Sequence, residues 1–274
     1  MRLSVLSSGS SGNATYMETD SGGLLVDAGL SRKRIEALLA RIGRSIDAVG
    51  AILLTHGHSD HTCGVRSLVR DRGIAVFAAP GVGESLGANT VAPEEVCTVG
   101  GLTVTFFEVP HDSSTYGVRV ADAESALAMA TDLGEAGIEV LRCMRGAEAV
   151  VLEANHELDW LRRGPYTASL KRRISSRHGH LSNRQAADAA VALAPYGLKD
   201  VVLAHLSKTN NSPTRACGTV YGALREAGHG GVRVRAAIAG HPTPWIEVGS
   251  PLQTSEHVYR YDEKDAAGQL FGIE

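Results

Sequence analysis

Three histidines and an aspartate lie within one short segment, His56-Gly57-His58-Ser59-Asp60-His61. The segment follows the apolar run Ala51–Thr55, which predicts a buried strand. Imidazole and carboxylate groups bind borderline divalent ions such as zinc, and a strand that ends in a loop lets alternate side chains converge on one point. The segment therefore predicts a divalent-metal site rather than a chance cluster of solvated polar side chains.

Three further residues of the same chemistry follow predicted strands. They are His111 after Phe106–Pro110, Asp132 after Ala126–Thr131, and His205 after Val201–Ala204. Any one of them alone is more often an ordinary polar residue at a strand end. Together they supply the missing ligands of a two-metal site. Two divalent ions about 4 Å apart activate a shared water and clamp the oxygens of an ester, so the expected reaction is hydrolysis.

The elements that must position these residues alternate between strands and helices. Short apolar runs predict strands at Leu3–Leu6, Thr15–Thr19, Leu24–Asp27, Ala51–Thr55, Ala75–Ala78, Leu102–Val109, Tyr116–Val120, Leu127–Thr131, Ala149–Leu152 and Val201–Ala204. Helical spacing of apolar residues predicts helices at Ser31–Ile42 and His61–Arg72, and near Gly134–Cys143, Asn183–Leu193 and Thr214–Ala227. This α/β pattern predicts a single domain over residues 1–274, with a weakly held tail from about residue 251.

Composition limits the class of protein. With 274 residues, 43% of them hydrophobic, the chain can bury one large core. Its apolar runs are far shorter than the roughly 20 residues of a membrane-spanning helix, so no membrane partner is expected. The cysteines Cys63, Cys97, Cys143 and Cys217 lack a Cys-x-x-Cys pair, and the N-terminus lacks a signal-peptide pattern, which together predict a cytoplasmic protein. The net charge of −3 excludes a wholly basic surface but allows a local basic patch.

The order His-x-His-x-Asp-His, followed by His, Asp and His at strand ends, resembles the metallo-β-lactamase superfamily. Additional segments resemble its YycJ/WalJ branch, and they are Ser8-Gly-Ser-Ser-Gly-Asn13, Thr131-Asp-Leu-Gly134, Glu153-Ala-Asn-His156, Gly179-His-Leu-Ser-Asn183 and Leu206-Ser-Lys-Thr-Asn-Asn211. The resemblance covers about residues 3–250. It implies an α/β fold, the four-layer αβ/βα sandwich with two mixed sheets, with the metals at the edge where the sheets meet.

The resemblance also implies two divalent ions, zinc or manganese, and a ligand set. One ion would be held by His56, His58 and His111, the other by Asp60, His61 and His205, with Asp132 bridging them. Asp27 matches an early aspartate of the superfamily that orders the metal loop without binding metal. Asp27 could equally be a plain turn residue before Gly29.

Similarity to ribonuclease Z and its relatives implies a catalytic pair. His180 would protonate the leaving oxygen, and Glu153 would hold its tautomer and raise its pKa. Asp60 is expected among the catalytic residues as well as among the ligands. His180 could instead be a surface residue, which is what we expect of neighbouring His178.

Several polar segments point to a phosphodiester substrate. Trp160–His180 contains Arg162, Arg163, Lys171, Arg172, Arg173 and Arg177 without an acidic residue, although a solvated helix face can have the same composition. The predicted substrate contacts are Arg172 and Arg173 from this segment, Ser207, Lys208, Asn210 and Asn211 after His205, and Ser8, Ser10, Ser11 and Asn13 from the Ser/Gly loop. That loop could equally be a structural turn.

The branch resemblance implies a 5′ to 3′ DNA exonuclease. Its mechanism would be in-line attack by a metal-bridging hydroxide, with His180 as proton donor. RNA is the second polymer considered, in a processing nuclease of the ribonuclease Z type. The same motifs would also suit a small-molecule cyclic phosphodiesterase, or a metal-binding regulatory or scaffold protein. The scaffold is disfavoured because a site without turnover has no need of a proton donor.

Overall fold

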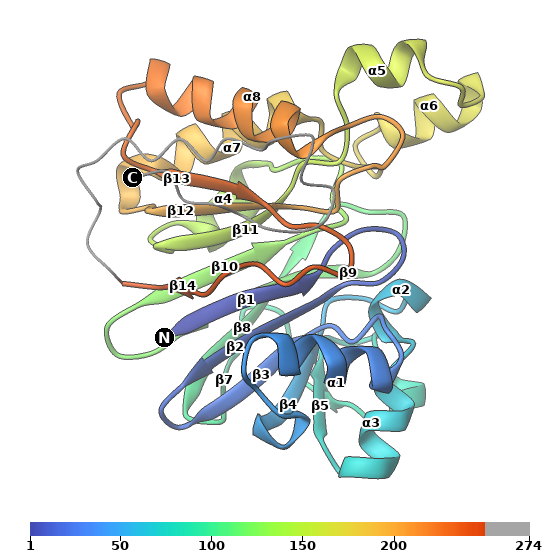
Figure 1. Ribbon diagram of the computed structural model, residues 1–274, viewed down its shortest axis with the longest axis vertical. Helices are drawn as coiled ribbons and strands as arrows, with labels where there is room; N and C mark the ends of the chain where they lie inside the picture. Colours follow the sequence, from blue (N-terminus) through green and yellow to red (C-terminus); the bar gives the residue numbers. More distant parts are fainter. Residues whose placement is uncertain (250–274) are drawn as a thin grey trace.

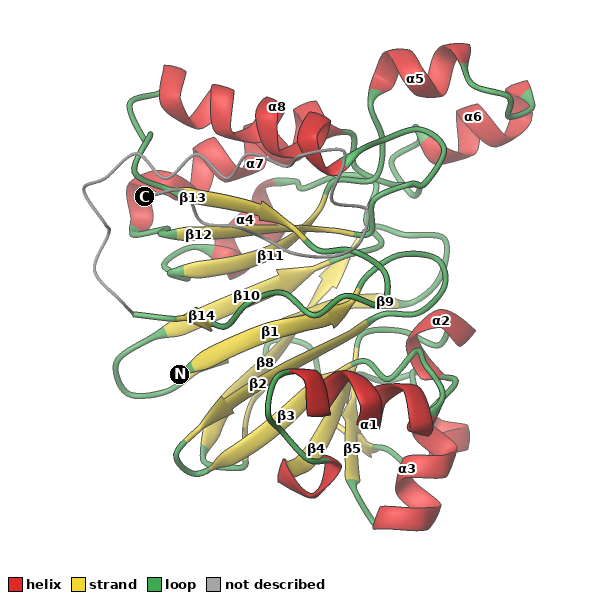
Figure 2. Cartoon of the chain, viewed as in Figure 1, coloured by secondary structure: helices red, strands yellow, loops and turns green. Residues whose placement is uncertain are grey.

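Two mixed sheets lie face to face, and helices cover their outer faces (Figures 1 and 2). The computed structural model describes residues 1–249, so the predicted tail from about residue 251 lies outside the described residues. Helices α1 (Arg32–Arg41) and α3 (Val65–Arg72) lie outside the first sheet, and α4 (Ile138–Met144), α7 (Asn183–Leu193) and α8 (Pro213–Glu226) outside the second. This arrangement confirms the predicted four-layer sandwich. Within residues 1–249, no helix is long and apolar enough to cross a membrane.

The strands of each sheet follow a regular spatial order. The first sheet runs β14 (Ile246–Glu247), β1 (Arg2–Ser7), β2 (Ala14–Thr19), β3 (Gly22–Val26), β4 (Val49–Leu54), β5 (Ala75–Ala78) and β6 (Asn89–Thr90). The second runs β13 (Arg233–Ala236), β12 (Asp200–Ala204), β11 (Ala149–Glu153), β10 (Ala126–Ala130), β9 (Thr115–Ala121), β8 (Leu102–Val109) and β7 (Val96–Val99). Strand β9 is antiparallel to both of its neighbours, β8 and β10, and β10, β11 and β12 are parallel to one another. The strands β8, β10, β11 and β12 therefore end at the same edge of the second sheet.

The helices are mostly short. They are α1 (Arg32–Arg41), α2 (Ser59–Thr62), α3 (Val65–Arg72), α4 (Ile138–Met144), α5 (Leu158–Arg163), α6 (Ala168–Ile174), α7 (Asn183–Leu193) and α8 (Pro213–Glu226), with 3-10 turns at Ile46–Ala48, Glu84–Leu86 and Ala194–Tyr196. Helix α7 begins with a capping box, in which the Ser182 side chain accepts from the Gln185 backbone and the Gln185 side chain accepts from the Ser182 backbone. The predicted helices at 183–193 and 214–227 are confirmed to within a residue or two.

Two predicted helices were wrong in extent. The helix predicted at His61–Arg72 is split into α2 and α3 at Gly64, whose backbone N–H donates to the Ala28 carbonyl at 2.8 Å. A Cβ at Gly64 would lie 2.2 Å from the Leu30 carbonyl oxygen, so this close approach requires glycine. The helix predicted near Gly134–Cys143 begins only at Ile138. Residues 134–137 form a loop because Gly134 packs against the Arg177 carbonyl.

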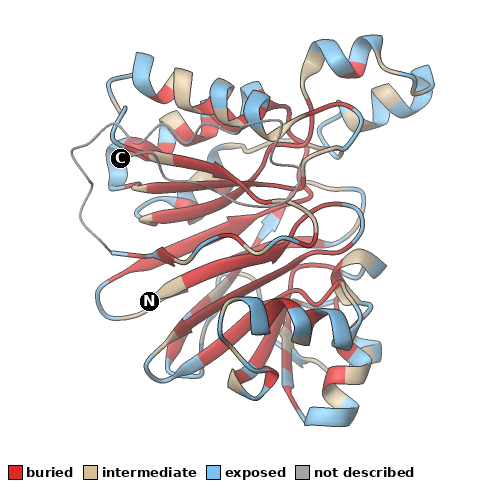
Figure 3. Ribbon diagram, in the orientation of Figure 1, coloured by how far each residue is buried: buried red, intermediate tan, exposed pale blue. Residues whose placement is uncertain are grey.

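The central strands β10, β11 and β12 of the second sheet are buried on both faces (Figure 3). In β10, Leu127 and Met129 face the core between the sheets, whereas Ala128 and Ala130 pack with the helices outside. Side chains alternate across a strand, so a strand covered on both faces needs a continuous apolar run. This explains why these strands could be recognised from runs of Ala, Val and Leu. The short β6, β7, β13 and β14 and the helices α5 and α6 lacked such a signal.

The end of the first sheet remote from the histidines carries a buried charge cluster. Glu18 accepts hydrogen bonds from Arg2 (2.7 Å), Arg44 (2.6 Å) and the Tyr16 hydroxyl (2.9 Å). Burial alone would raise the pKa of Glu18, but the hydrogen bonds from Arg44 and Arg2 lower it from 4.5 to about 2. The Arg2 guanidinium also stacks 4.3 Å from the Trp245 ring centre, which joins β1 to the chain before β14.

We expect Glu18→Gln to lower the free energy of unfolding at pH 7 by about 1.5–3 kcal/mol, because it removes the charge that both guanidinium groups need. Since the folded pKa is depressed, this stabilisation is complete above about pH 4.5 and is lost as the pH falls toward 2. Urea unfolding of both proteins at several pH values measures the difference, with exposed Glu226→Gln as the control. A difference that grows as the pH falls would contradict this assignment.

Candidate metal centre and active site

The predicted ligands gather at one edge of the sandwich. His56 follows β4, His111 follows β8, Asp132 follows β10 and His205 follows β12. Because β8, β10 and β12 end at the same edge, residues distant in sequence meet there. The carboxyl ends of strands are the usual location of ligand sites in open α/β sheets.

The imidazole rings form a continuous cluster. His56 has its ring centre 4.7 Å from that of His58 and 4.0 Å from that of His61. His111 lies 5.9 Å from both His56 and His58. The His56 Nε2 and His58 Nδ1 atoms are 3.1 Å apart. The three residues expected to share one metal are therefore close together.

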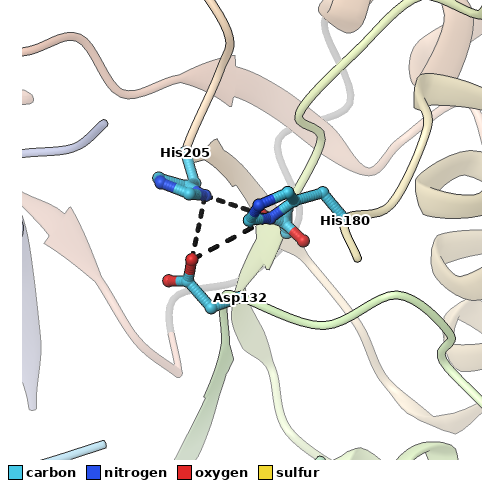
Figure 4. Close-up of side chains that lie close together, drawn as sticks. Asp132, His180 and His205 are labelled. Carbon is cyan, nitrogen blue, oxygen red and sulfur yellow. Dashed lines mark hydrogen bonds and ion pairs between the residues drawn. The ribbon is translucent and has the colours of Figure 1, made fainter. Parts of the chain in front are cut away.

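Asp132 lies at the centre of the cluster, facing His205 and close to His180 (Figure 4). Its Oδ2 is 3.1 Å from His61 Nε2, and its Oδ1 is 3.3 Å from His205 Nδ1. Although His61 is close, Oδ2 is buried and forms no hydrogen bond with any described residue. A buried carboxylate oxygen without a donor is costly unless a cation neutralises it. The donor set of imidazoles and carboxylates thus fits divalent ions around Asp132.

Three site residues have an unusual backbone conformation. Asp27, Asp132 and His205 have φ values of 61°, 57° and 55°, in the left-handed region. Non-glycine residues seldom adopt this region, and Asp and His tolerate it better than most. Each residue directly follows a strand, β3, β10 or β12, or is separated from it by one residue. The tight turn that ends each strand therefore aims a functional side chain toward the cluster.

Asp27 holds His61 in place. Its Oδ2 accepts from His61 Nδ1 at 2.7 Å, and its Oδ1 accepts from the Thr55 backbone N–H at 2.9 Å. Both Asp27 and His61 are fully buried. Because a carboxylate only accepts hydrogen bonds, His61 carries its proton on Nδ1 and presents the Nε2 lone pair to the metal side. This contact fits the role predicted for Asp27, which is to order a metal ligand, and not the role of a plain turn residue.

The Ser/Gly loop, Ser8–Asn13, contacts two of the predicted metal ligands. Gly9 and Gly12 have φ values of 131° and 134°, which the loop requires of glycine. Ser8 Oγ accepts from the His205 backbone N–H at 2.8 Å, and Asn13 Nδ2 lies 2.9 Å from His61 Nε2. The loop thereby joins β1 to the ends of both sheets.

Glu153 connects the metal ligands to His180. Its Oε1 accepts from His205 Nδ1 at 2.7 Å and from His180 Nδ1 at 2.9 Å. Its Oε2 accepts from the backbone N–H groups of Leu133 and Leu181, each at 3.1 Å. Glu153 is fully buried, and all its hydrogen bonds hold neighbouring parts of the site. Both imidazoles therefore donate through Nδ1 and leave Nε2 free.

The pKa values follow from these surroundings. Burial, reinforced by the nearby His61, lowers the pKa of His56 to about 2, and burial also lowers the pKa of His111. Burial would lower the pKa of His180 as well, but the Glu153 carboxylate outweighs it and raises the pKa to about 9. His56 and His111 are thus neutral, as ligands must be. At His61 the carboxylates of Asp27 and Asp132 outweigh burial and raise the pKa, and at His205 those of Asp132 and Glu153 do the same. His180 differs from His56 and His111 because it carries a proton at neutral pH.

A cavity of about 430 Å³ opens at this edge, beside His111, His180 and His205. Among the predicted substrate contacts, Ser10, Ser207, Lys208 and Arg173 line it. Ser11 and Arg172 are exposed but do not belong to its described lining. A larger hollow of about 1,050 Å³ near Glu18 contains none of the predicted site residues.

Four predicted substrate contacts lie inside the protein instead. Ser8, Asn13, Asn210 and Asn211 are all buried. Asn211 Nδ2 donates to the Ala154 carbonyl and to Asn183 Oδ1, each at 2.8 Å. These polar residues follow the predicted ligands or the first strand closely in sequence, but the turns direct their side chains inward.

Sequence reasoning missed several residues of the cavity, among them Asp112 and Tyr166. Asp112 lies with one oxygen 3.1 Å from His111 Nε2, and its other oxygen contacts Arg173. Tyr166 lines the cavity from the segment between α5 and α6. Asp112 could have been identified from the sequence, because it directly follows the predicted ligand His111. Nothing in the sequence around Tyr166 distinguishes it from a surface aromatic residue.

The fold and the ligand set define a metal-dependent hydrolase of the metallo-β-lactamase type. A family model described as a β-lactamase superfamily domain matches residues 23–206, and the chain belongs to this family. It is 36% identical over 239 residues to exodeoxyribonuclease WalJ of Streptococcus pneumoniae serotype 2, covering 82% of this chain and 89% of that protein. It is 38% identical over 243 residues to exodeoxyribonuclease YycJ of Bacillus anthracis, covering 84% and 91%.

Solved structures support the fold independently. The Zn²⁺-bound PqqB from Methylobacterium extorquens superposes with a TM-score of 0.66 at 19% identity, covering 89% of this chain and 100% of that chain. At this identity the likeness concerns the fold alone. Taken with the family match, it confirms the fold predicted from the ligand motif.

Asp27→Asn should weaken metal binding by about 10- to 100-fold, because the amide does not replace the carboxylate that fixes the His61 tautomer. Competition with a chelator of known affinity measures the change. Asp20→Asn, an exposed acidic residue of the turn after β2, is the matched control and should leave the affinity unaltered. Equal affinity in Asp27→Asn and the wild type would argue against a role for Asp27 in ordering the site.

Proposed function

We propose that this chain is a metal-dependent exonuclease that hydrolyses DNA from the 5′ end. One observation carries the proposal: His180, held by Glu153, sits beside the Asp132-centred ligands in a cavity that Lys208 and Arg173 also line. Metal ligands, a proton donor and cations in one cavity suit hydrolysis of a phosphodiester. The two relatives named exodeoxyribonucleases support DNA as the substrate.

The proposed cofactors are two divalent ions, zinc or manganese. His56, His58 and His111 would hold one, Asp60, His61 and His205 the other, with Asp132 between them. When bound, such ions lower the pKa of water and neutralise charge on phosphate oxygens. Asp27 and Glu153 hold the imidazoles of His61 and His205 in the tautomer that this requires.

His180 is the proposed proton donor to the leaving oxygen. Its Nδ1 is occupied by Glu153, so its second ring nitrogen is left to face the cavity. Glu153 acts as a positioning residue, since it keeps the imidazole oriented and charged.

Substrate contacts are proposed for the residues that line the cavity. Ser10, Ser207, Lys208 and Arg173 would bind phosphate oxygens near the reacting bond. Ser8, Asn13, Asn210 and Asn211 are proposed as positioning residues because they are buried. Ser11 and Arg172, exposed outside the cavity, would contact DNA further along the strand.

A polymer fits better than a small cyclic phosphodiester. Arg162 and Arg163 are exposed at the end of α5, outside the cavity lining, where only an extended substrate reaches them. Such cations bind the nucleic-acid backbone without reading sequence. We further propose that the protein works in the cytoplasm, a compartment that keeps thiols reduced, since all four cysteines are free.

A cleavage time course tests the activity. Metal-stripped protein is reloaded with zinc or manganese and given 5′- and 3′-labelled single- and double-stranded DNA and RNA. Stepwise release of nucleotides from the 5′ end of DNA, absent in Asp132→Ala, is the expected result. Turnover of a cyclic phosphodiester without degradation of any polymer would contradict the proposal.

His180→Ala should lower kcat on DNA by about 10²- to 10⁴-fold while both metals remain bound, because His180 is the proposed proton donor and is not one of the proposed ligands. Single-turnover rates and metal analysis of the same samples measure the two effects. The control is His241→Ala, an exposed histidine whose Nδ1 contacts the Ala239 backbone carbonyl at 3.1 Å. Full activity of the His180 variant would exclude His180 as the donor.

A further inference from the structure

The segment that contains α5 and α6 presents an apolar row to the cavity. Tyr166, Leu170 and Ile174 recur at intervals of four residues and all line it. Leu170 and Ile174 lie on one face of α6, and Tyr166 lies two residues before the helix begins at Ala168. Leu170 remains 37% exposed although it is a large apolar residue. The rest of the lining is mostly polar, with imidazoles, hydroxyls, cations and the carboxylate of Asp112, and an apolar row is not needed to bind phosphate.

Tyr166 has no fixed role within the protein. It is half-buried, and its hydroxyl forms no hydrogen bond with any residue in the described part of the chain. The hydroxyl of a tyrosine that is packed into a protein usually finds a hydrogen-bond partner. A tyrosine that lines the cavity and has no hydrogen-bond partner for its hydroxyl among the described residues is therefore available to a ligand.

The segment is anchored firmly to the metal edge. The Arg173 guanidinium pairs with Asp112, which neighbours His111. Lys171 Nζ donates to the Arg162 carbonyl at 2.7 Å and ties α6 to α5. Gly164 packs so closely that a Cβ there would lie 2.5 Å from Asn210 Oδ1, in the loop after β12. The apolar row is thus held at a set position relative to the ligands.

The polar part of the cavity comes from the loop after β12. Ser207 and Lys208 line it together with the apolar row, and the imidazoles of His180 and His205 also belong to the lining. A nucleotide likewise has an apolar part, its flat base, and a polar part, its anionic phosphate. The volume of about 430 Å³ is in the lower part of the range for small-molecule pockets and suits one nucleotide rather than an intact base pair.

We propose that Tyr166, with Leu170 and Ile174, forms a slot that stacks the unpaired base of the terminal nucleotide while its phosphate lies at the metal edge. The inference rests on the proposed exonuclease function. It adds that the terminal base pair must open before hydrolysis, because the slot accepts one base. Base stacking on aromatic side chains tolerates any sequence, as a degrading enzyme requires.

The test compares removal of the terminal nucleotide from a blunt duplex and from the same duplex with a mismatched terminal pair. The wild type should act on the mismatched end about tenfold faster or more. Tyr166→Ala should raise KM and lower kcat/KM on both ends by roughly 5- to 100-fold. Tyr166→Phe keeps the ring and should stay within about twofold of the wild type. Tyr196→Ala, an exposed tyrosine after α7, is the matched control and should leave the rates unaltered.

The outcomes separate this inference from the proposed function. If DNA is degraded but paired and mismatched ends react equally, or Tyr166→Ala matches the wild type, the slot is wrong and the exonuclease stands. If Tyr166→Phe falls as far as Tyr166→Ala, the hydroxyl rather than the ring carries the effect, and the stacking role is likewise excluded. If the metal-loaded wild type degrades no DNA, both proposals fail.

Discussion

A buried carboxylate that needs a cation determines the organisation of this protein. Asp132 places an oxygen where no described residue gives it a hydrogen bond, with His61 and His205 beside it. Such an arrangement is stable only with positive charge between the groups. The edge where the two sheets meet satisfies this constraint, because it brings imidazoles from both sheets to one carboxylate.

Other site residues hold these imidazoles close to the Asp132 carboxylate. Glu153 joins His205, on the metal side, to His180, on the substrate side, through a single oxygen. Asp27 holds His61 in the same way from the other sheet. The left-handed backbone at Asp27, Asp132 and His205 is unfavourable in conformational energy. The packing of the buried strands that precede these residues offsets this cost. Stability of the fold and geometry of the site are therefore coupled.

Much of this arrangement could be predicted from the sequence because its signals are local. The cluster His56–His61 and the apolar strands identify themselves by residue type and period, and the family motif supplied the layers and ligand order. Contacts between distant segments could not be predicted in this way. The break at Gly64 depends on the backbone of Ala28 and Leu30, and the inward direction of Ser8 and Asn211 depends on partners far along the chain. The position of Tyr166 similarly results from how α6 docks.

The number and positions of the metal ions test the account most directly. Crystals of the metal-loaded protein, measured at the absorption edges of zinc and manganese, would give anomalous peaks for each ion. We expect two peaks on either side of the Asp132 carboxylate, one near His56, His58 and His111 and one near Asp60, His61 and His205. A single peak remote from Asp132, or one confined to His58, His111 and Asp112, would contradict it.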